Sequence, residues 1–170
     1  LTVMRECAGP YLLRAGGSDF SKGILYMEQA TPLSELLASH YYKLTLKGLC
    51  NLLVDIASGL KELLNHGILY RDIHLNNIFL WTDPLLGKTT YKLGDFGSCT
   101  FTDKSGKYAG ITERGGVGSK WYMAPETWNE EIFDERSAVY GVGMIAYYLL
   151  SDMKKTVIMV AFMFKMLQQC

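Results

Sequence analysis

The sequence predicts an α+β domain in which short β-hairpins lead into a mainly helical part. Apolar residues recur at steps of three and four over about residues 45–65, which is typical of one buried helix face. A second, more uniformly apolar helix is expected over residues 137–150. Short apolar runs bounded by Gly, Ser, Asp and Pro indicate strands. A chain of 170 residues is long enough for one domain with its own core.

The first expected element is a β-hairpin. Residues 11–14 and 24–27 are apolar runs on either side of a turn rich in Gly, Ser and Asp at residues 16–21. Residues 32–39 then suit a short helix, with Thr31 as its N-cap and Pro32 in its first turn.

The long helix is expected to end at His66 and Gly67. Two strands, residues 78–81 and 89–93, flank a slightly enlarged turn at residues 83–88. Residues 98–117 are rich in Gly, Ser, Thr and Lys and predict a flexible surface segment. Residues 156–164 are nearly all apolar, but a bilayer-spanning helix needs about 20 residues, so a core or amphipathic helix is expected there.

Composition narrows the class of protein. Hydrophobic residues make up 49% of the chain and charged residues 20%, which indicates a globular fold. Lys plus Arg and Asp plus Glu number 17 each, so no net charge favours nucleic acid or an anionic membrane as a partner. The four cysteines lack metal-ligand spacing and predict reduced thiols in the cytoplasm. The chain shows no signal peptide and begins with Leu1 instead of Met, which indicates a fragment of a longer, cytoplasmic protein.

A loop after the long helix carries the first chemical motif, Tyr70-Arg71-Asp72-Ile73-His74-Leu75-Asn76-Asn77. Eighteen residues beyond Asn77 comes Asp95-Phe96-Gly97, preceded by a strand-like run. An Asp and an Asn five apart, followed by a second Asp after a hairpin, are typical of a phosphoryl-transfer site. One carboxylate orients a hydroxyl nucleophile there, while the Asn and the other carboxylate hold a divalent metal on the phosphates.

A third motif, Gly118-Ser119-Lys120-Trp121-Tyr122-Met123-Ala124-Pro125-Glu126, follows in order. With these three motifs the sequence resembles the C-terminal lobe of a eukaryotic-type protein kinase, with a Ser/Thr-like pattern. The resemblance covers roughly residues 10–152. It implies that residues 1–30 are a remnant of the N-lobe with the hinge, that residues 31–152 are the C-lobe, and that residues 153–170 are an atypical apolar tail. It also implies an incomplete kinase-like fold, ATP and Mg²⁺ as cofactors, and protein Ser/Thr hydroxyls as substrates.

The resemblance assigns roles to individual residues. Asp72 is the expected catalytic base, with His74 and Asn77 beside it in the catalytic loop. Asn77 and Asp95 are the expected Mg²⁺ ligands. The expected nucleotide-binding residues are Met27 in the gatekeeper position, Glu28 and Ala30 through their backbone groups, Phe79 and Asp95.

Further residues are expected to serve the activation segment and the substrate. Arg71 pairs with an activating phosphate in kinases regulated that way. Phe96 would pack under the site, Gly97 would let the backbone reverse, and Ser119 would bond to the catalytic Asp. Glu126 would pair with an Arg late in the lobe. Candidate phosphate acceptors are Thr102, Ser105, Tyr108, Thr112 and Ser119. Cys99 either lies near the nucleotide or is an inert thiol, and the inert thiol is favoured.

Three departures from the family pattern affect the expected activity. His74 stands where Ser/Thr kinases have a Lys, and an imidazole gives a phosphate weaker electrostatic support. Ala138 stands where the family has an Asp that accepts backbone hydrogen bonds from the catalytic loop. No Gly-rich loop and no strand Lys can be placed in residues 1–25. Transfer by the isolated chain is therefore expected to be weak or absent.

Two alternatives to a Ser/Thr kinase remain. A pseudokinase or scaffold would bind partners without turnover, which Ala138, His74 and the missing N-lobe motifs favour. A small-molecule phosphotransferase shares the Asp and Asn loop, but the Ala-Pro-Glu motif and the long segment before it argue against this reading.

Overall fold

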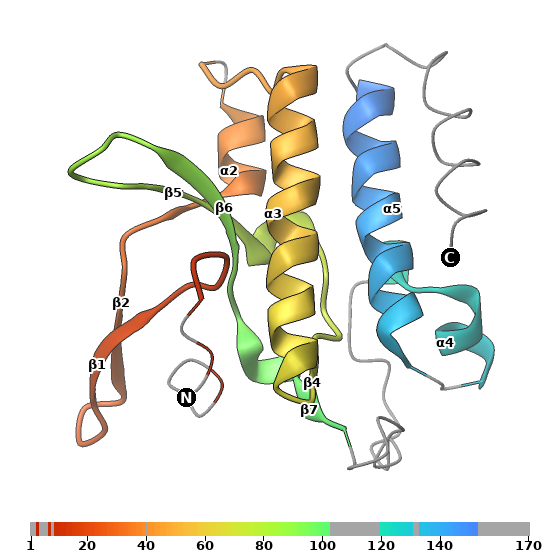
Figure 1. The fold of residues 1–170 in the computed structure, drawn as a ribbon, viewed down its shortest axis with the longest axis horizontal. Coiled ribbons are helices and arrows are strands. Elements are labelled where there is room, and N and C mark those ends of the chain that lie inside the picture. The colour runs from red at the N-terminus through yellow and green to blue at the C-terminus, as the bar shows by residue number, and fades with distance from the viewer. Residues whose placement is uncertain are drawn as a thin grey trace.

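The computed structural model describes residues 3, 7, 9–39, 41–102, 120–130 and 133–152 (Figure 1). Most of the expected activation segment, Ser119 and the apolar tail lie outside the described residues. The elements follow one another as β1 (Ala15–Asp19), β2 (Ile24–Met27), β3 (Thr31–Pro32), α2 (Leu33–Ala38), α3 (Leu46–Asn65), β4 (Ile68–Leu69), β5 (Ile78–Thr82), β6 (Thr89–Leu93), β7 (Thr100–Phe101), α4 (Pro125–Glu130) and α5 (Glu135–Asp152). This mixture confirms the predicted α+β class.

Helix α3 is the central element of the core. Its buried residues, which include Leu49, Leu52, Ile56 and Leu63, follow the predicted steps of three and four. The Thr45 hydroxyl caps the first turn by accepting the Gly48 N–H at 3.0 Å. Gly67, at φ 67°, follows the C-terminal end, where a left-handed residue suits the chain reversal. The predicted helix and both of its ends are therefore confirmed.

Helices α3 and α5 lie side by side and run in opposite directions (Figure 1). Helix α5 is longer than the expected helix over residues 137–150 and buries Ile145 and Leu149 against the core. Its other face is exposed at Val139, Tyr140 and Tyr147, so the helix is only partly buried. Within the residues that the structure describes, no helix is both long and apolar enough to cross a membrane.

A three-stranded antiparallel sheet in the order β3-β5-β6 packs beside α3. Strands β5 and β6 pair from Ile78 opposite Leu93 to Thr82 opposite Thr89, as the sequence predicts. Gly59 lets α3 approach closely, because a Cβ there would lie 3.2 Å from Cδ1 of Leu93 and 3.1 Å from the carbonyl oxygen of Tyr11. The face of β6 that carries Leu93 therefore belongs to the core.

The expected N-terminal hairpin forms, but its first strand and its turn were misplaced. Strand β1 pairs with β2 through Ala15, Gly17, Ser18 and Asp19, with an irregularity at Gly16, and Gly23, at φ 65°, lies in the turn. The apolar residues 11–14 run beside β6 instead, where Leu13 N–H donates to Leu93 O at 2.8 Å. Burial explains the difference, since Leu12 and Leu13 are buried in the core whereas β2 is exposed on every residue.

The predicted N-cap of the first short helix is also wrong. Helix α2 has Pro32 at its N-cap position and no side-chain cap, because Thr31 and Pro32 pair with Leu80 and Phe79 of β5. Backbone pairing with the sheet thus holds Thr31 in an extended conformation outside the helix.

Candidate active site

The catalytic loop, residues 70–77, is held at its start by a short two-stranded sheet. Strands β4 and β7 pair Leu69 with Thr100, and the Thr102 N–H donates to the Gly67 carbonyl at 2.7 Å. The Thr102 hydroxyl also donates to that carbonyl, at 3.2 Å. This sheet brings the segment after Asp95-Phe96-Gly97 alongside the start of the loop.

Tyr70 ties the loop to the second motif. Its buried hydroxyl donates to the Gly94 carbonyl, and its ring meets Phe96 edge-on with 6.0 Å between ring centroids. Burial raises the pKa of the Tyr70 hydroxyl well above its ordinary value, and the nearby Cys99, Asp72 and Asp95 raise it further. The carboxylates of Asp72 and Asp95 therefore both lie close enough to Tyr70 to influence the pKa of its hydroxyl.

Asp72 and Asn77 are in direct contact. The Asn77 side-chain amide donates to the backbone carbonyl of Asp72 at 3.0 Å and approaches its Oδ2 at 3.4 Å. Asn77 is buried, and its backbone carbonyl accepts the Gly94 N–H at 2.9 Å. Asn77 thus joins the loop that carries Asp72 to the segment that leads to Asp95.

His74 faces Asp72. The Nδ1 atom of His74 accepts the Asn76 N–H at 3.2 Å, which leaves the proton of the neutral imidazole on Nε2. That Nε2 lies 3.3 Å from Oδ1 of Asp72. The two carboxylate oxygens of Asp72 are therefore oriented by different side chains, His74 and Asn77.

Asp95 is the one described residue other than Gly with a positive φ, 49°. Its side chain accepts the Gly97 N–H at 3.2 Å, which closes a tight turn. Gly97, which was expected to let the backbone reverse, does not have a positive φ, and its role stays a prediction. Gly94 is needed for space, because a Cβ there would lie 2.5 Å from Cε2 of Phe79.

The Arg71 side chain donates from Nε to the Ser98 carbonyl at 2.7 Å, and its pairing with an activating phosphate stays a prediction. Cys99 follows directly, and burial raises the pKa of its thiol to about 12 although Arg71 acts in the opposite direction. Cys50 and Cys99 are both free thiols. The high pKa supports the prediction that Cys99 is an inert thiol.

The hinge segment, residues 28–32, connects β2 to the sheet. Glu28 N–H donates to the Arg14 carbonyl at 3.1 Å, and the Glu28 carboxylate accepts the Arg14 N–H at 2.8 Å. The same carboxylate oxygen lies 2.7 Å from Nζ of Lys92. Met27 is 50% exposed, whereas Ala30 is half-buried.

Lys92 is a residue that the sequence analysis missed. Its side chain is only 3% exposed, and its ammonium group lies 4.1 Å from the centroid of the Trp81 ring. The available signal was a Lys placed between the apolar residues Tyr91 and Leu93 of one strand. Strand alternation places it on the face opposite those two side chains.

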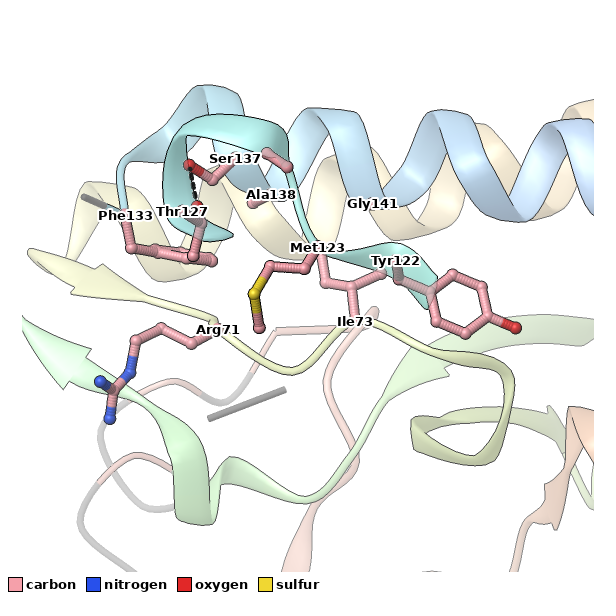
Figure 2. A pocket seen from close by; sticks show the side chains of 10 residues that line it. Arg71, Ile73, Tyr122, Met123, Thr127, Phe133, Ser137, Ala138 and Gly141 are labelled. Atoms are coloured by element: carbon pink, nitrogen blue, oxygen red, sulfur yellow. Dashed lines mark hydrogen bonds between the residues drawn. The ribbon is translucent and has the colours of Figure 1, made fainter. Parts of the chain in front are cut away.

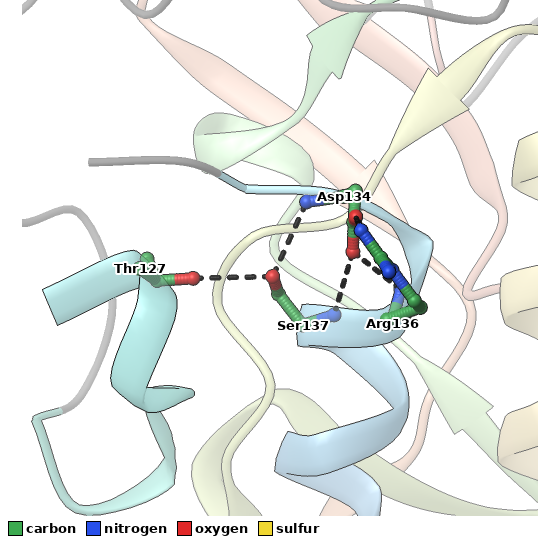
Figure 3. Close-up of polar contacts among 4 residues, drawn as sticks. All are labelled: Thr127, Asp134, Arg136 and Ser137. Carbon is green, nitrogen blue, oxygen red and sulfur yellow. Dashed lines mark hydrogen bonds and ion pairs between the residues drawn. The ribbon is translucent and has the colours of Figure 1, made fainter. Parts of the chain in front are cut away.

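A polar cluster at the start of α5 was also missed (Figure 3). The Asp134 carboxylate accepts the N–H groups of Arg136 and Ser137, at 2.8 and 3.2 Å, and forms an ion pair with the Arg136 side chain. Ser137 Oγ accepts the Asp134 N–H at 3.2 Å and the Thr127 hydroxyl at 3.1 Å. The spacing Asp-x-x-Ser is the signal for such a reciprocal cap. It fixes the end of α5 that faces the catalytic loop.

A small cavity separates the catalytic loop from α5 (Figure 2). It has room for about one water molecule. Arg71 and Ile73 line it from the loop, while Ser137, Ala138 and Gly141 line it from α5. The Arg71 guanidinium points away from it (Figure 2). The cavity therefore lies where the family's Asp would stand in place of Ala138.

The donor chemistry of Asp72, Asn77 and Asp95 fits Mg²⁺, which takes oxygen ligands and keeps several waters. Among the described residues, no group of three His, Cys, Asp or Glu side chains could hold a metal. A cation at this site would therefore depend on the Asn77 amide, on water and on phosphate oxygens as well as on carboxylates. Glu126 lies apart from this group, half-buried in the first turn of α4.

Comparison with known proteins gives a consistent result. A family model described as "Protein kinase domain" matches residues 3–158. The chain is 27% identical over 151 residues to the serine/threonine-protein kinase cst-1 of Caenorhabditis briggsae, covering 86% of this chain and 28% of that protein.

Two further relatives are similar over shorter stretches. The eukaryotic translation initiation factor 2-alpha kinase pek-1 of Caenorhabditis elegans is 30% identical over 107 residues, which is 59% of this chain and 10% of pek-1. The serine/threonine-protein kinase SKM1 of Saccharomyces cerevisiae is 32% identical over 119 residues, which is 69% of this chain and 15% of SKM1. The chain thus spans less than a third of the length of each of these relatives.

Proposed function

The chain belongs to the protein kinase domain family, and from this premise we propose that it is the catalytic core of an ATP-dependent protein Ser/Thr kinase. It would transfer the γ-phosphoryl group of ATP to protein hydroxyls. Residues 1–30 would supply the hinge side of the nucleotide site, and residues 31–152 would supply the catalytic lobe. The contact between Asp72 and Asn77, linked through the Asn77 carbonyl to Gly94 directly before Asp95, is the observation on which the proposal rests.

Asp72 would act as the base in this reaction. A loose phosphoryl-transfer transition state needs an oriented acceptor hydroxyl more than a strong base. His74 and Asn77 hold the two oxygens of Asp72, so the carboxylate can accept the hydrogen of a Ser or Thr hydroxyl from one fixed position.

Asn77 and Asp95 would hold Mg²⁺, which supplies charge neutralisation at the phosphates when it is bound. Asn77 is oriented for this role by its contacts with the Asp72 backbone and with Gly94. Asp95 is oriented by its left-handed backbone and by the Gly97 N–H.

The hinge segment and Phe79 would bind the adenine base. Glu28 and Ala30 would offer backbone groups, with Met27 in the gatekeeper position. The tight approach of Phe79 to Gly94 supports this role, because it places the Phe79 ring directly beside the start of the Asp95 motif.

The experiment that tests the proposal is transfer of radioactive γ-phosphate from Mg²⁺-ATP to a mixed library of Ser and Thr peptides. We expect weak incorporation by the 170-residue chain and none by Asp72→Asn or Asp95→Asn. Asp83→Asn is the matched control, since Asp83 caps an exposed turn with the Leu85 and Leu86 N–H groups and lies outside the site. Incorporation by Asp72→Asn equal to that of the unsubstituted chain would overturn the assignment of the base.

A binding module without turnover is the second candidate function. The cavity beside Ala138 favours it. Three residues of α5 line this cavity, and only Ser137 of them has a polar side chain that could bond the loop. Mg²⁺-dependent ATP binding with no incorporation by any chain, including one with Ala138→Asp, would favour the module over the enzyme.

The expected partners are ATP and a protein carrying Ser or Thr, with neither nucleic acid nor membrane as a main partner of these residues. The free thiols Cys50 and Cys99 support action in a reducing compartment, for which we propose the cytoplasm.

A further inference from the structure

Lys92 is a buried cation with no role in the proposed transfer. Strand β6 directs Tyr91 and Leu93 toward the α3 side, so Lys92 lies on the opposite face. It stands directly across from Phe79 in the β5–β6 register and over the Trp81 ring. This is the face that would bind the adenine base.

The partner of Lys92 is the first residue of the hinge segment. One oxygen of Glu28 lies 2.7 Å from Lys92 Nζ and also accepts the Arg14 N–H at 2.8 Å. The Glu28 N–H in turn donates to the Arg14 carbonyl. The backbone of Glu28 is therefore bonded to Arg14, directly before β1. The side chain of Glu28 is bonded both to Arg14 and to Lys92 of β6.

The other end of the hinge segment is fixed to the same hairpin. Thr31 and Pro32 pair with Leu80 and Phe79 of β5. The hinge segment is thus attached at both ends. An ion pair links its start to β6, and backbone pairing links its end to β5. Residues 29 and 30 lie between these two attachments.

A buried ion pair adds little net stability compared with apolar side chains of the same size, because both charges lose their hydration. It does penalise geometries that separate the two charges, since the Lys92 ammonium group, with its side chain only 3% exposed, would then be buried without a carboxylate. The arrangement therefore suits a device that selects one position of the hinge backbone.

We propose that the Glu28–Lys92 ion pair positions the hinge backbone and thereby sets the affinity of the site for a purine base. The part that concerns the base rests on the proposed function. Lys92 and the Glu28 carboxylate are positioning residues, because they act through the backbone of residues 28–30 and do not themselves touch the phosphates.

The first measurement needs no nucleotide. Hydrogen–deuterium exchange of a peptide covering the hinge segment is compared with that of a peptide from α3, in the 170-residue chain. Lys92→Met and Glu28→Gln should speed exchange in the hinge at least tenfold and leave α3 unchanged. Lys92→Arg, which keeps the charge, should restore slow exchange. Slow hinge exchange in a folded Lys92→Met chain would overturn the positioning role.

The second measurement is the dissociation constant for adenosine, which carries no phosphate and so does not involve Asp72 or Asp95. Lys92→Met should raise it about tenfold, and Lys92→Arg should return it to within about twofold. An unchanged constant in Lys92→Met, when hinge exchange is faster, would overturn the link to base affinity. If the unsubstituted chain binds no adenosine, the proposed nucleotide site fails, while the exchange experiment still decides the positioning role.

Two further variants complete the experiment. The double variant Glu28→Gln, Lys92→Met leaves no unpaired charge and keeps the test valid if a single variant does not fold; it should still show fast hinge exchange. Lys22→Met is the matched control, because Lys22 pairs with Asp19 at 3.4 Å on the exposed turn of the same hairpin. Equal effects of Lys22→Met and Lys92→Met on the hinge would contradict the proposal.

Discussion

The catalytic loop is held very differently on its two sides. Toward β6 it is tied by polar contacts, through the Tyr70 hydroxyl on Gly94 and the Asn77 carbonyl on the Gly94 N–H. Toward α5 the contact is apolar, with Ile73 against Gly141 and a small cavity beside Ala138 (Figure 2). We infer from this difference that the geometry of the loop depends mainly on its contacts with Gly94, directly after β6, and much less on α5.

The largest effect is expected from the polar side. Tyr70→Ala removes a buried ring and should lower the free energy of unfolding by about 3–5 kcal/mol. Tyr70→Phe keeps the ring but leaves the Gly94 carbonyl without its donor, which should cost about 1–3 kcal/mol. Urea unfolding of both variants separates the packing of the ring from its hydrogen bond. Equal losses in the two variants would show that the bond, and not the ring, holds this side.

The next largest effect is a gain in stability on the side of the loop that faces α5. Ala138→Asp should place a carboxylate in the cavity beside Arg71 and Ile73, where it can accept loop N–H groups. A charge-assisted hydrogen bond contributes about 1.5–3 kcal/mol, and desolvation of the carboxylate offsets part of that. We therefore expect a rise in the free energy of unfolding of about 1 kcal/mol, measured by urea titration.

Ala146→Asp is the control for that gain. Ala146 is also buried on α5 but does not line the cavity, so an Asp there has no loop to bond and should destabilise the protein. If Ala138→Asp destabilises as much as Ala146→Asp, the α5 side of the loop offers no free donors and the contrast between the two sides is smaller than proposed.

A smaller effect is expected at the start of α5, where Asp134 caps the helix. Asp134→Ala removes the cap of α5 and should cost about 1 kcal/mol, whereas Asp134→Asn keeps the cap and should cost only a few tenths. Burial alone would raise the pKa of Asp134, but its bonds to Arg136 and to the Ser137 N–H outweigh this and hold the pKa below its ordinary value of 3.8.

The sign of the pH dependence follows from that lowered pKa. The stabilisation by Asp134 is fully present above the unfolded-state pKa of its carboxyl, near 3.8, and is lost as pH falls through the lower folded-state pKa. The difference in unfolding free energy between the unsubstituted chain and Asp134→Ala should therefore be constant from pH 7 to about 5 and shrink below 3.8. A difference that is unchanged at pH 3 would mean that the charge of Asp134 adds nothing to the cap.

The polar side is also the part of the molecule that the sequence predicts well. Helix α3, strands β5 and β6 and the loop between Tyr70 and Asn77 follow from apolar periodicity, turn residues and local spacing. The fold class and the kinase family are confirmed, whereas the roles of Asp72, Asn77 and Asp95 remain predictions. The geometry adds the contact between Asp72 and Asn77 and the bond from Gly94 to the Asn77 carbonyl, which spacing alone does not give.

The errors occur where long-range pairing overrides local signals. The apolar residues 11–14 resemble a hairpin strand, but burial beside β6 draws them away from β2. Thr31 is a good N-cap residue by type, yet its pairing with Leu80 keeps it extended. Lys92 was missed for the same reason, since its partner Glu28 lies 64 positions away in the sequence.

The smallest expected effect is on the chemical reactivity of a thiol. Cys99 follows the Arg71–Ser98 contact on the polar side, and its pKa of about 12 instead of 9.0 lowers its thiolate fraction about a thousandfold at pH 8. Iodoacetamide should therefore modify the exposed Cys50 long before Cys99, as followed by peptide mass spectrometry. Tyr70→Phe should speed the modification of Cys99 and leave Cys50 unchanged, because opening the polar side exposes this thiol to water. Ala138→Asp could instead alter the rate of Cys99 modification more than Tyr70→Phe does. In that case α5 would influence the loop more strongly than the contacts with Gly94, which contradicts the comparison.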